Sequence, residues 1–121
     1  MEKLNRWEKD NILNARLEKN VIEAIKERHK DNVWIYKPSK NDGCVPDIIL
    51  CFFGHFIALD IRAKSFKKSE YDRDVDAPDK KILGLVNLSG GTGFIGRSKT
   101  SILERLEKIL DVLLWEKISS K

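Results

Sequence analysis

Two short runs of β-branched and aromatic residues, residues 47–53 and 56–64, are separated by only the dipeptide Gly54-His55. A two-residue connection that contains glycine at its first position is typical of a type II′ hairpin turn. Such a turn fixes the register of the two strands, so we expect Phe53 to lie opposite Phe56. This hairpin constrains the fold strongly, because both of its faces are apolar near the turn. Other parts of the protein must therefore pack against each face.

The predicted register places charged residues at the open end of the hairpin. Counting outward from the turn pairs Ile49 with Asp60. It also pairs Asp47 with Arg62, and all four side chains share one face because side chains alternate along a strand. Asp47 and Asp60 then lie roughly 5 to 8 Å apart at Cβ, close enough to share one hard cation. The same residues also fit a structural ion-pair cluster, in which Arg62 neutralises the two carboxylates.

The composition suits one soluble domain that spans residues 1–121. The chain has 121 residues, of which 41% are hydrophobic, as in a single domain with a modest core. Lys and Arg exceed Asp and Glu by 23 to 19, and the resulting charge of +4 is compatible with binding to nucleic acid. We find no long apolar run and no signal peptide, so we expect a cytoplasmic protein without a membrane segment.

Apolar periodicity and turn residues predict the remaining elements. We expect a long helix over residues 7–29, a strand over 33–37, a helix from about 76 to 88, a strand over 92–96 and a last helix from 101 to about 118. The capping box Ser101 to Glu104 marks the start of the last helix. The apolar stripe of that helix is wider than one packing face needs, so it serves either the core or a dimer contact.

Glu18 lies on the edge of the apolar stripe of the first predicted helix. A carboxylate directed from this position toward the sheet would complete a cation site with Asp47 and Asp60. The alternative is a glutamate on the flank of the helix that pairs with a nearby Lys or Arg.

A stretch rich in both charge signs, residues 64–81, follows the predicted hairpin. It is either a solvated connection or a flap that contacts DNA, with Lys64, Lys67 and Lys68 near the carboxylate end. Both interpretations are open at the level of the sequence.

The order of the predicted elements is helix, three strands, helix, strand and helix. Pro46-Asp47 begins the second strand and Asp60-Ile61-Arg62 lies late in the third, which resembles the αβββαβ core of the PD-(D/E)XK nuclease superfamily. Residues 43–50, 56–64 and 88–98 resemble motifs of the virus-type replication-repair nuclease (VRR-NUC) domain. Small phage proteins of that family are similar in length, and the resemblance covers residues 18–106.

This resemblance implies an α/β fold with a restriction-endonuclease-like αβββαβ core, in which helices flank a mixed central sheet and a C-terminal helix follows. It implies an endonuclease that depends on Mg²⁺ or Mn²⁺ and hydrolyses phosphodiester bonds of DNA with a metal-activated water. The expected substrates are branched DNA or Holliday junctions. Phage-type members act as homodimers, and a phage-encoded member would work in the cytoplasm of the host cell.

The resemblance also assigns roles to individual residues. Asp47 and Asp60 match the two metal-binding acids, and Glu18 matches an acid that some members supply from the first helix. The main-chain carbonyl of Ile61 matches the backbone metal ligand. Arg62 stands where the family has its lysine.

Arg62 is a departure from the family pattern, because a guanidinium stays protonated and cannot act as a base. It can still polarise the attacking water and stabilise negative charge on the phosphate, with Lys64 reaching back toward Asp60. Lys80 and Lys81 stand where family members often carry glutamine, and either is suited to contact phosphate. The expected DNA contacts are Lys40, Lys64, Lys67, Lys68, Lys80 and Lys81.

Two other functional classes fit the same sequence. The first is a nuclease-fold module that binds DNA and has lost turnover at Arg62. The second is an interaction protein that reuses the fold, for example to inhibit another nuclease.

Overall fold

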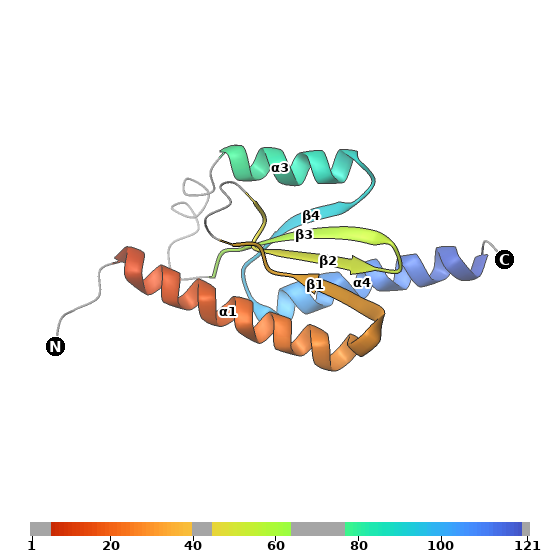
Figure 1. Cartoon of the computed structure of the whole chain (residues 1–121), viewed down its shortest axis with the longest axis horizontal. Helices are drawn as coiled ribbons and strands as arrows, with labels where there is room; N and C mark the ends of the chain where they lie inside the picture. Colours follow the sequence, from red (N-terminus) through yellow and green to blue (C-terminus); the bar gives the residue numbers. More distant parts are fainter. Residues whose placement is uncertain (1–5, 40–44, 64–76, 120–121) are drawn as a thin grey trace.

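The computed structural model describes the backbone of residues 6–39, 45–63 and 77–119. This part of the chain is an α/β structure with a four-stranded mixed sheet and three α-helices, the last of which is C-terminal, as the sequence predicts. The elements in chain order are α1 (Arg6–His29), the short 3₁₀ helix η1 (Lys30–Asn32), β1 (Val33–Tyr36), β2 (Ile48–Phe52), β3 (His55–Ile61), α3 (Ala77–Leu88), β4 (Thr92–Gly96) and α4 (Lys99–Ser119) (Figure 1). None of the described helices is long and apolar enough to cross a membrane.

The strands are arranged in the order β1-β2-β3-β4. The β1–β2 and β2–β3 pairs are antiparallel, whereas β3 and β4 run parallel. Parallel neighbours require a crossover connection, and α3 lies between β3 and β4 in the chain. In Figure 1 the strands lie between α3 on one side and α1 on the other.

The hairpin turn lies one residue earlier than the sequence predicts. Phe52 pairs with His55, so the two central residues of the turn are Phe53 and Gly54 and not Gly54-His55. Phe53 has a φ of 49° and Gly54 a φ of 83°, and two positive φ values define a type I′ turn. This turn matches the right-handed twist of the strands, which compensates for placing a bulky residue in the left-handed region.

The earlier turn shifts the register by two residues. Ile49 pairs with Ala58 and not with Asp60, and the continued ladder brings Asp47 opposite Asp60 and not opposite Arg62. Phe56 pairs with Cys51 and not with Phe53, so all three predicted cross-strand pairs are wrong. The predicted faces are nevertheless correct, because a shift of two equals the period of the pleat and leaves every side chain on its face.

One face of the sheet forms the core together with α1 and α4. The side chains of Ile48, Leu50 and Phe52 of β2 are fully buried there. Each pairs with a residue of β3 that points to the same side. The other members of this core are Val21, Ala24, Ile25, Ile57, Leu59, Ile61, Phe94, Ile102, Leu103, Leu106 and Leu110.

Among the described elements, α3 covers the opposite face over β3 and β4. A Cβ atom on Gly93 would lie 2.8 Å from the main-chain oxygen of Leu83, so α3 approaches β4 closely at this glycine. Over β1 and β2 the same face is open, and the side chains of Trp34 and Tyr36 are 59% and 47% exposed. The expected cover on both sides of the hairpin is therefore complete on the core face and partial on the other.

The N-terminus of α4 is capped by Ser98 and not by the predicted Ser101. The main-chain amide of Ser101 donates a hydrogen bond of 3.2 Å to Oγ of Ser98, and the two hydroxyls are 2.8 Å apart. Ser98 immediately precedes the first helical residue, which is the position that satisfies the unpaired amides of the first turn.

Candidate functional site

Two aspartates face each other at the open end of the β2–β3 ribbon. The main-chain amide of Asp47 donates a hydrogen bond of 3.2 Å to Oδ1 of Asp60. The main-chain amide of Ile61 donates a hydrogen bond of 2.7 Å to Oδ2 of Asp47. Each carboxylate is therefore oriented by an amide of the opposite strand, and the strand pairing itself sets the geometry of the pair.

The two carboxylates differ in exposure. Asp60 is only 4% exposed, whereas the side chain of Asp47 is 34% exposed. Two negative charges repel each other, and burial strengthens the repulsion because less water screens it. The pair therefore creates a strong local demand for a cation.

Arg62 supplies a positive charge to this site. Its Nη1 donates a hydrogen bond of 2.8 Å to the main-chain oxygen of Ile61 and lies 3.5 Å from Oδ2 of Asp47. The guanidinium thus stands between a carboxylate and the carbonyl that the family resemblance implies as a backbone metal ligand. This arrangement corresponds to the ion-pair cluster that was the alternative interpretation of these residues.

The backbone of this strand end is fixed from two sides. The amide of Arg62 donates to the main-chain oxygen of Gly96 at 2.8 Å, which extends the β3–β4 pairing by one step. The amide of Ala63 donates to Oδ1 of Asn14 at 2.7 Å. Asn14 was missed at the level of the sequence, although it lies seven residues before Val21 and so continues the apolar stripe of α1 with a polar side chain.

Glu18 is 5% exposed and lies in α1, which packs on the core face of the sheet. Its Oε1 lies 3.6 Å from Nζ of Lys37, directly after β1. Asp60 alternates with the core residues Leu59 and Ile61 and so points to the other face. Among the described residues, no three His, Cys, Asp or Glu side chains are grouped closely enough to hold a metal ion. Glu18 thus contacts Lys37, and among the described residues it does not form a group of three metal ligands with the aspartate pair.

Most of the predicted DNA contacts are lysines whose side chains the structure does not describe. Lys40, Lys64, Lys67 and Lys68 lie outside the described residues. Lys80 lies in the first turn of α3, and only its backbone is described. Lys81 is exposed to solvent, as a phosphate contact requires.

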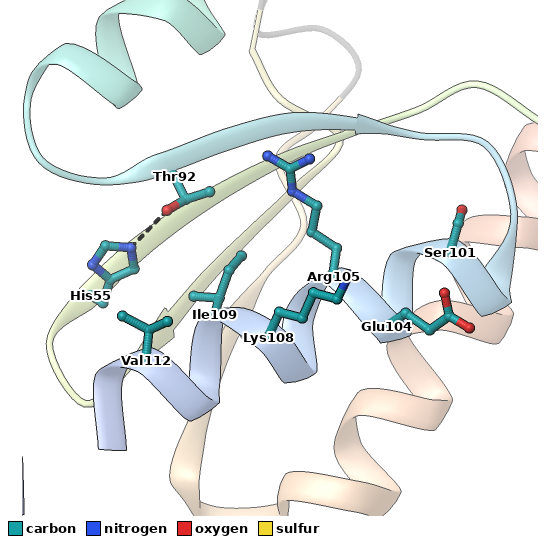
Figure 2. A pocket seen from close by; sticks show the side chains of 8 residues that line it. All are labelled: His55, Thr92, Ser101, Glu104, Arg105, Lys108, Ile109 and Val112. Carbon is teal, nitrogen blue, oxygen red and sulfur yellow. Dashed lines mark hydrogen bonds between the residues drawn. The ribbon is translucent and has the colours of Figure 1, made fainter. Parts of the chain in front are cut away.

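A cavity of about 480 Å³ lies at the other end of the sheet, between α4 and the first residues of β3 and β4. Figure 2 shows His55 and Thr92 on one side, and their side chains are joined by a hydrogen bond of 2.9 Å. The guanidinium of Arg105 lies over the ring of Phe94, 4.9 Å from its centre. The lining contains one acid, Glu104, and therefore lacks the paired carboxylates of the Asp47 end.

No family model, no curated protein and no solved structure matches this chain. The function is therefore inferred from the chemistry of the aspartate pair and its surroundings.

Proposed function

We propose that this protein is a DNA endonuclease that depends on Mg²⁺ or Mn²⁺. The observation that supports the proposal is the pair Asp47 and Asp60, held side by side by two cross-strand hydrogen bonds with one of them 4% exposed. Oxygen atoms are the ligands that these ions prefer, and Mg²⁺ commonly binds through one or two carboxylates together with water and phosphate. The donor set of this strand end therefore fits such an ion.

Each residue has a distinct role in this proposal. Asp47 and Asp60 would hold the ion, and the carbonyl of Ile61 would offer a third oxygen. A divalent ion bound there would supply a water of lowered pKa and would neutralise negative charge on the phosphate. Arg62 orients the water and stabilises the negative charge that develops on the phosphate, because a guanidinium presents several donors in a fixed plane. Lys64 is a second proposed cation.

Arg62 also opposes the entry of a cation. Its Nη1 contacts Oδ2 of Asp47 and the carbonyl of Ile61, and both residues belong to the proposed ligand set. We therefore expect the guanidinium to turn away from these oxygens when an ion binds and toward the phosphate when DNA binds. The exchange would keep the aspartate pair, of which Asp60 is buried, close to a positive charge in both states.

Selectivity for branched DNA or Holliday junctions belongs to the same proposal and rests on the resemblance of residues 43–50 and 56–64. A homodimer with two sites related by a two-fold axis would cut two strands symmetrically. We also propose that the protein acts on DNA in the cytoplasm.

The direct test incubates the protein with labelled four-way junction, duplex and single-stranded DNA in Mg²⁺ or Mn²⁺. We expect cleavage by the wild type and a loss of at least about 100-fold in Asp47→Asn, since even outer-shell changes at metal sites cost up to this factor. Asp111→Asn is the matched control, because Asp111 is exposed on α4 and far from the site in sequence. Absence of cleavage with either ion, or cleavage that persists in Asp47→Asn, contradicts the proposal.

A second candidate function is a nuclease-fold module that binds DNA and turns over poorly. It is favoured by the 2.8 Å hydrogen bond through which Arg62 occupies the Ile61 carbonyl. This candidate predicts binding that weakens with salt and no cleavage. The variant Arg62→Lys distinguishes the two candidate functions. Cleavage by the variant but not by the wild type indicates an enzyme that lost its activity at this position. Cleavage at a similar rate by both proteins indicates an active site that is adapted to arginine.

A further inference from the structure

Two aromatic rings stand exposed on the edge strand β1. Trp34 is 59% exposed and Tyr36 is 47% exposed. Their ring centres are 5.8 Å apart and their planes differ by 10°, so the rings are stacked. Large aromatic side chains usually bury most of their surface, and an exposed stacked pair marks a surface that is suited to a flat aromatic ligand.

These rings lie on the same face of the sheet as the aspartate pair. Tyr36 pairs with Ile49 and Trp34 pairs with Cys51, and both partners share the face of Asp47 because they are two and four residues from it. Tyr36 is therefore roughly 7 Å and Trp34 roughly 14 Å from Asp47 along the strand direction. Trp34, Tyr36 and the half-buried Asp47 therefore lie along one face of the β1–β2 part of the sheet.

Among the described elements, α3 covers the β3–β4 half of this face and leaves Trp34 and Tyr36 of β1 exposed. Phe56, which pairs with Cys51, is still 43% exposed. It lines a shallow cavity of about 300 Å³ together with Ile82, Leu85 and Val86. The open surface thus extends from Trp34 across the sheet to the edge of α3.

Positive charges lie at the carboxylate end of this surface. Arg62 points to the same face as Asp60, and Arg97 follows β4 at the same end of the sheet. With a charge of +4 on the whole chain, these cations favour a ligand that combines flat rings with phosphates.

We propose that Trp34 and Tyr36 form a stacking platform for unpaired nucleobases of DNA. Aromatic side chains stack on any base, whereas the bases of an intact duplex are paired and stacked and cannot present a ring face. The class of substrate is therefore DNA with a single-stranded segment, such as a flap, a splayed arm or a tail. The position of the platform beside the scissile phosphate rests on the proposed nuclease function, but stacking itself requires no cleavage.

The test measures binding by fluorescence anisotropy in EDTA, with a labelled single strand of about 15 nucleotides and a blunt duplex of the same sequence. We expect Trp34→Ala to weaken binding of the single strand roughly 5- to 150-fold, the range that corresponds to one lost base stack. Duplex binding should stay unchanged. Trp115→Ala is the matched control, because Trp115 is 71% exposed on the last turns of α4.

Trp34→Phe keeps an aromatic ring and should retain most of the affinity, which separates stacking from a folding defect. Three results overturn the proposal: tighter binding of the blunt duplex than of the single strand, no loss in Trp34→Ala, or an equal loss on both DNAs. A change in oligomeric state of Trp34→Ala without an effect on DNA also overturns it, since the face is then a contact between copies. If the wild type binds the single strand through Trp34 but does not cleave DNA in Mg²⁺, only the proposed nuclease function is contradicted. If Trp34→Ala cleaves single-stranded and duplex DNA as the wild type does, only the stacking platform is contradicted.

Discussion

Asp47 and Asp60 face each other across the open end of the β2–β3 ribbon, and the amide of Asp47 donates a hydrogen bond of 3.2 Å to Oδ1 of Asp60. The carboxylates are thus held by backbone groups whose positions depend on the strand pairing. Because Asp60 is almost fully buried, its charge cannot be satisfied by solvent and must be balanced by neighbouring groups. This relationship makes the site sensitive to any change in the local positive charge.

Removal of the positive charge of Arg62 should strengthen the binding of Mn²⁺. The guanidinium contacts Oδ2 of Asp47 and the carbonyl of Ile61, so Arg62→Gln removes a competing donor from both oxygens and also removes a like charge. We expect the affinity, measured by isothermal titration calorimetry, to rise on the order of tenfold, which equals about 1.4 kcal/mol. Arg105→Gln removes a guanidinium that lies over Phe94 and should leave the affinity unchanged. An unchanged or weaker affinity in Arg62→Gln would show that Arg62 does not compete with the ion.

Divalent ions should stabilise the wild type against heating through the aspartate pair. An ion that binds only the folded state adds about 2.7 kcal/mol at a concentration of 100 times its Kd. We expect differential scanning fluorimetry to show a rise in Tm of several degrees with Mg²⁺ or Mn²⁺. Asp47→Asn should abolish this rise, whereas Asp111→Asn on the exposed surface of α4 should retain it. An equal rise in both variants would place the ion elsewhere on the protein.

Much of the fold follows from local sequence patterns. The helical spacing of apolar residues places α1, and a short apolar strand bounded by glycines places β4 at its observed limits. The turn was misplaced because the dipeptide Phe53-Gly54 lacks the Asn or Asp that usually marks a type I′ turn. The positive φ of Phe53 depends on the twist of the whole β2–β3 ribbon, and a local sequence pattern does not reveal this twist.

The candidate site was predictable to a similar degree. That Asp47 and Asp60 share a face follows from the period of the strand and survives the error of two residues in register. The partners of the charged groups depend on side-chain rotamers and on packing between distant elements. The contact of Arg62 with the Ile61 carbonyl and the pairing of Glu18 with Lys37 are of this kind, so the sequence left alternatives open for both.

The side chain of Asn87 in α3 forms hydrogen bonds with the outer edge of β4. Its Nδ2 donates to the main-chain oxygen of Gly93 at 3.1 Å, and its Oδ1 accepts from the amide of Gly93 at 2.7 Å. The side chain therefore replaces a neighbouring strand at this residue and protects the edge from pairing with another chain. We expect Asn87→Ala to lower the free energy of unfolding by about 1 to 3 kcal/mol in urea denaturation, because two hydrogen bonds are lost.

Asn20→Ala is the control for this variant, because Asn20 is exposed on α1. It should change the free energy of unfolding by no more than about 0.5 kcal/mol. A similar effect of both substitutions would mean that the contact with Gly93 contributes little to stability.

Gly96 and Gly84 should respond in opposite directions to the same substitution by alanine. A Cβ atom on Gly96 would overlap the side chain of Ile102, because β4 and α4 are in direct contact at this point. Overpacking of a core contact costs about 1 to 3 kcal/mol, so we expect Gly96→Ala to lower the urea midpoint. A Cβ atom on Gly84, within α3, meets no atom within 4 Å. Gly84→Ala should therefore stabilise the protein by about 0.5 to 1 kcal/mol, because glycine is a weaker helix former than alanine.

The double variant Gly96→Ala with Ile102→Val tests the cause of the expected loss. Valine lacks the terminal methyl group of isoleucine, so part of the overlap with the new Cβ should disappear. We expect the loss in the double variant to be smaller than the sum of the losses in the two single variants, as for residues in direct contact. Additive losses in urea denaturation would show that β4 and α4 are not packed together at Gly96, and the cover of the core face by α4 would then have to be revised.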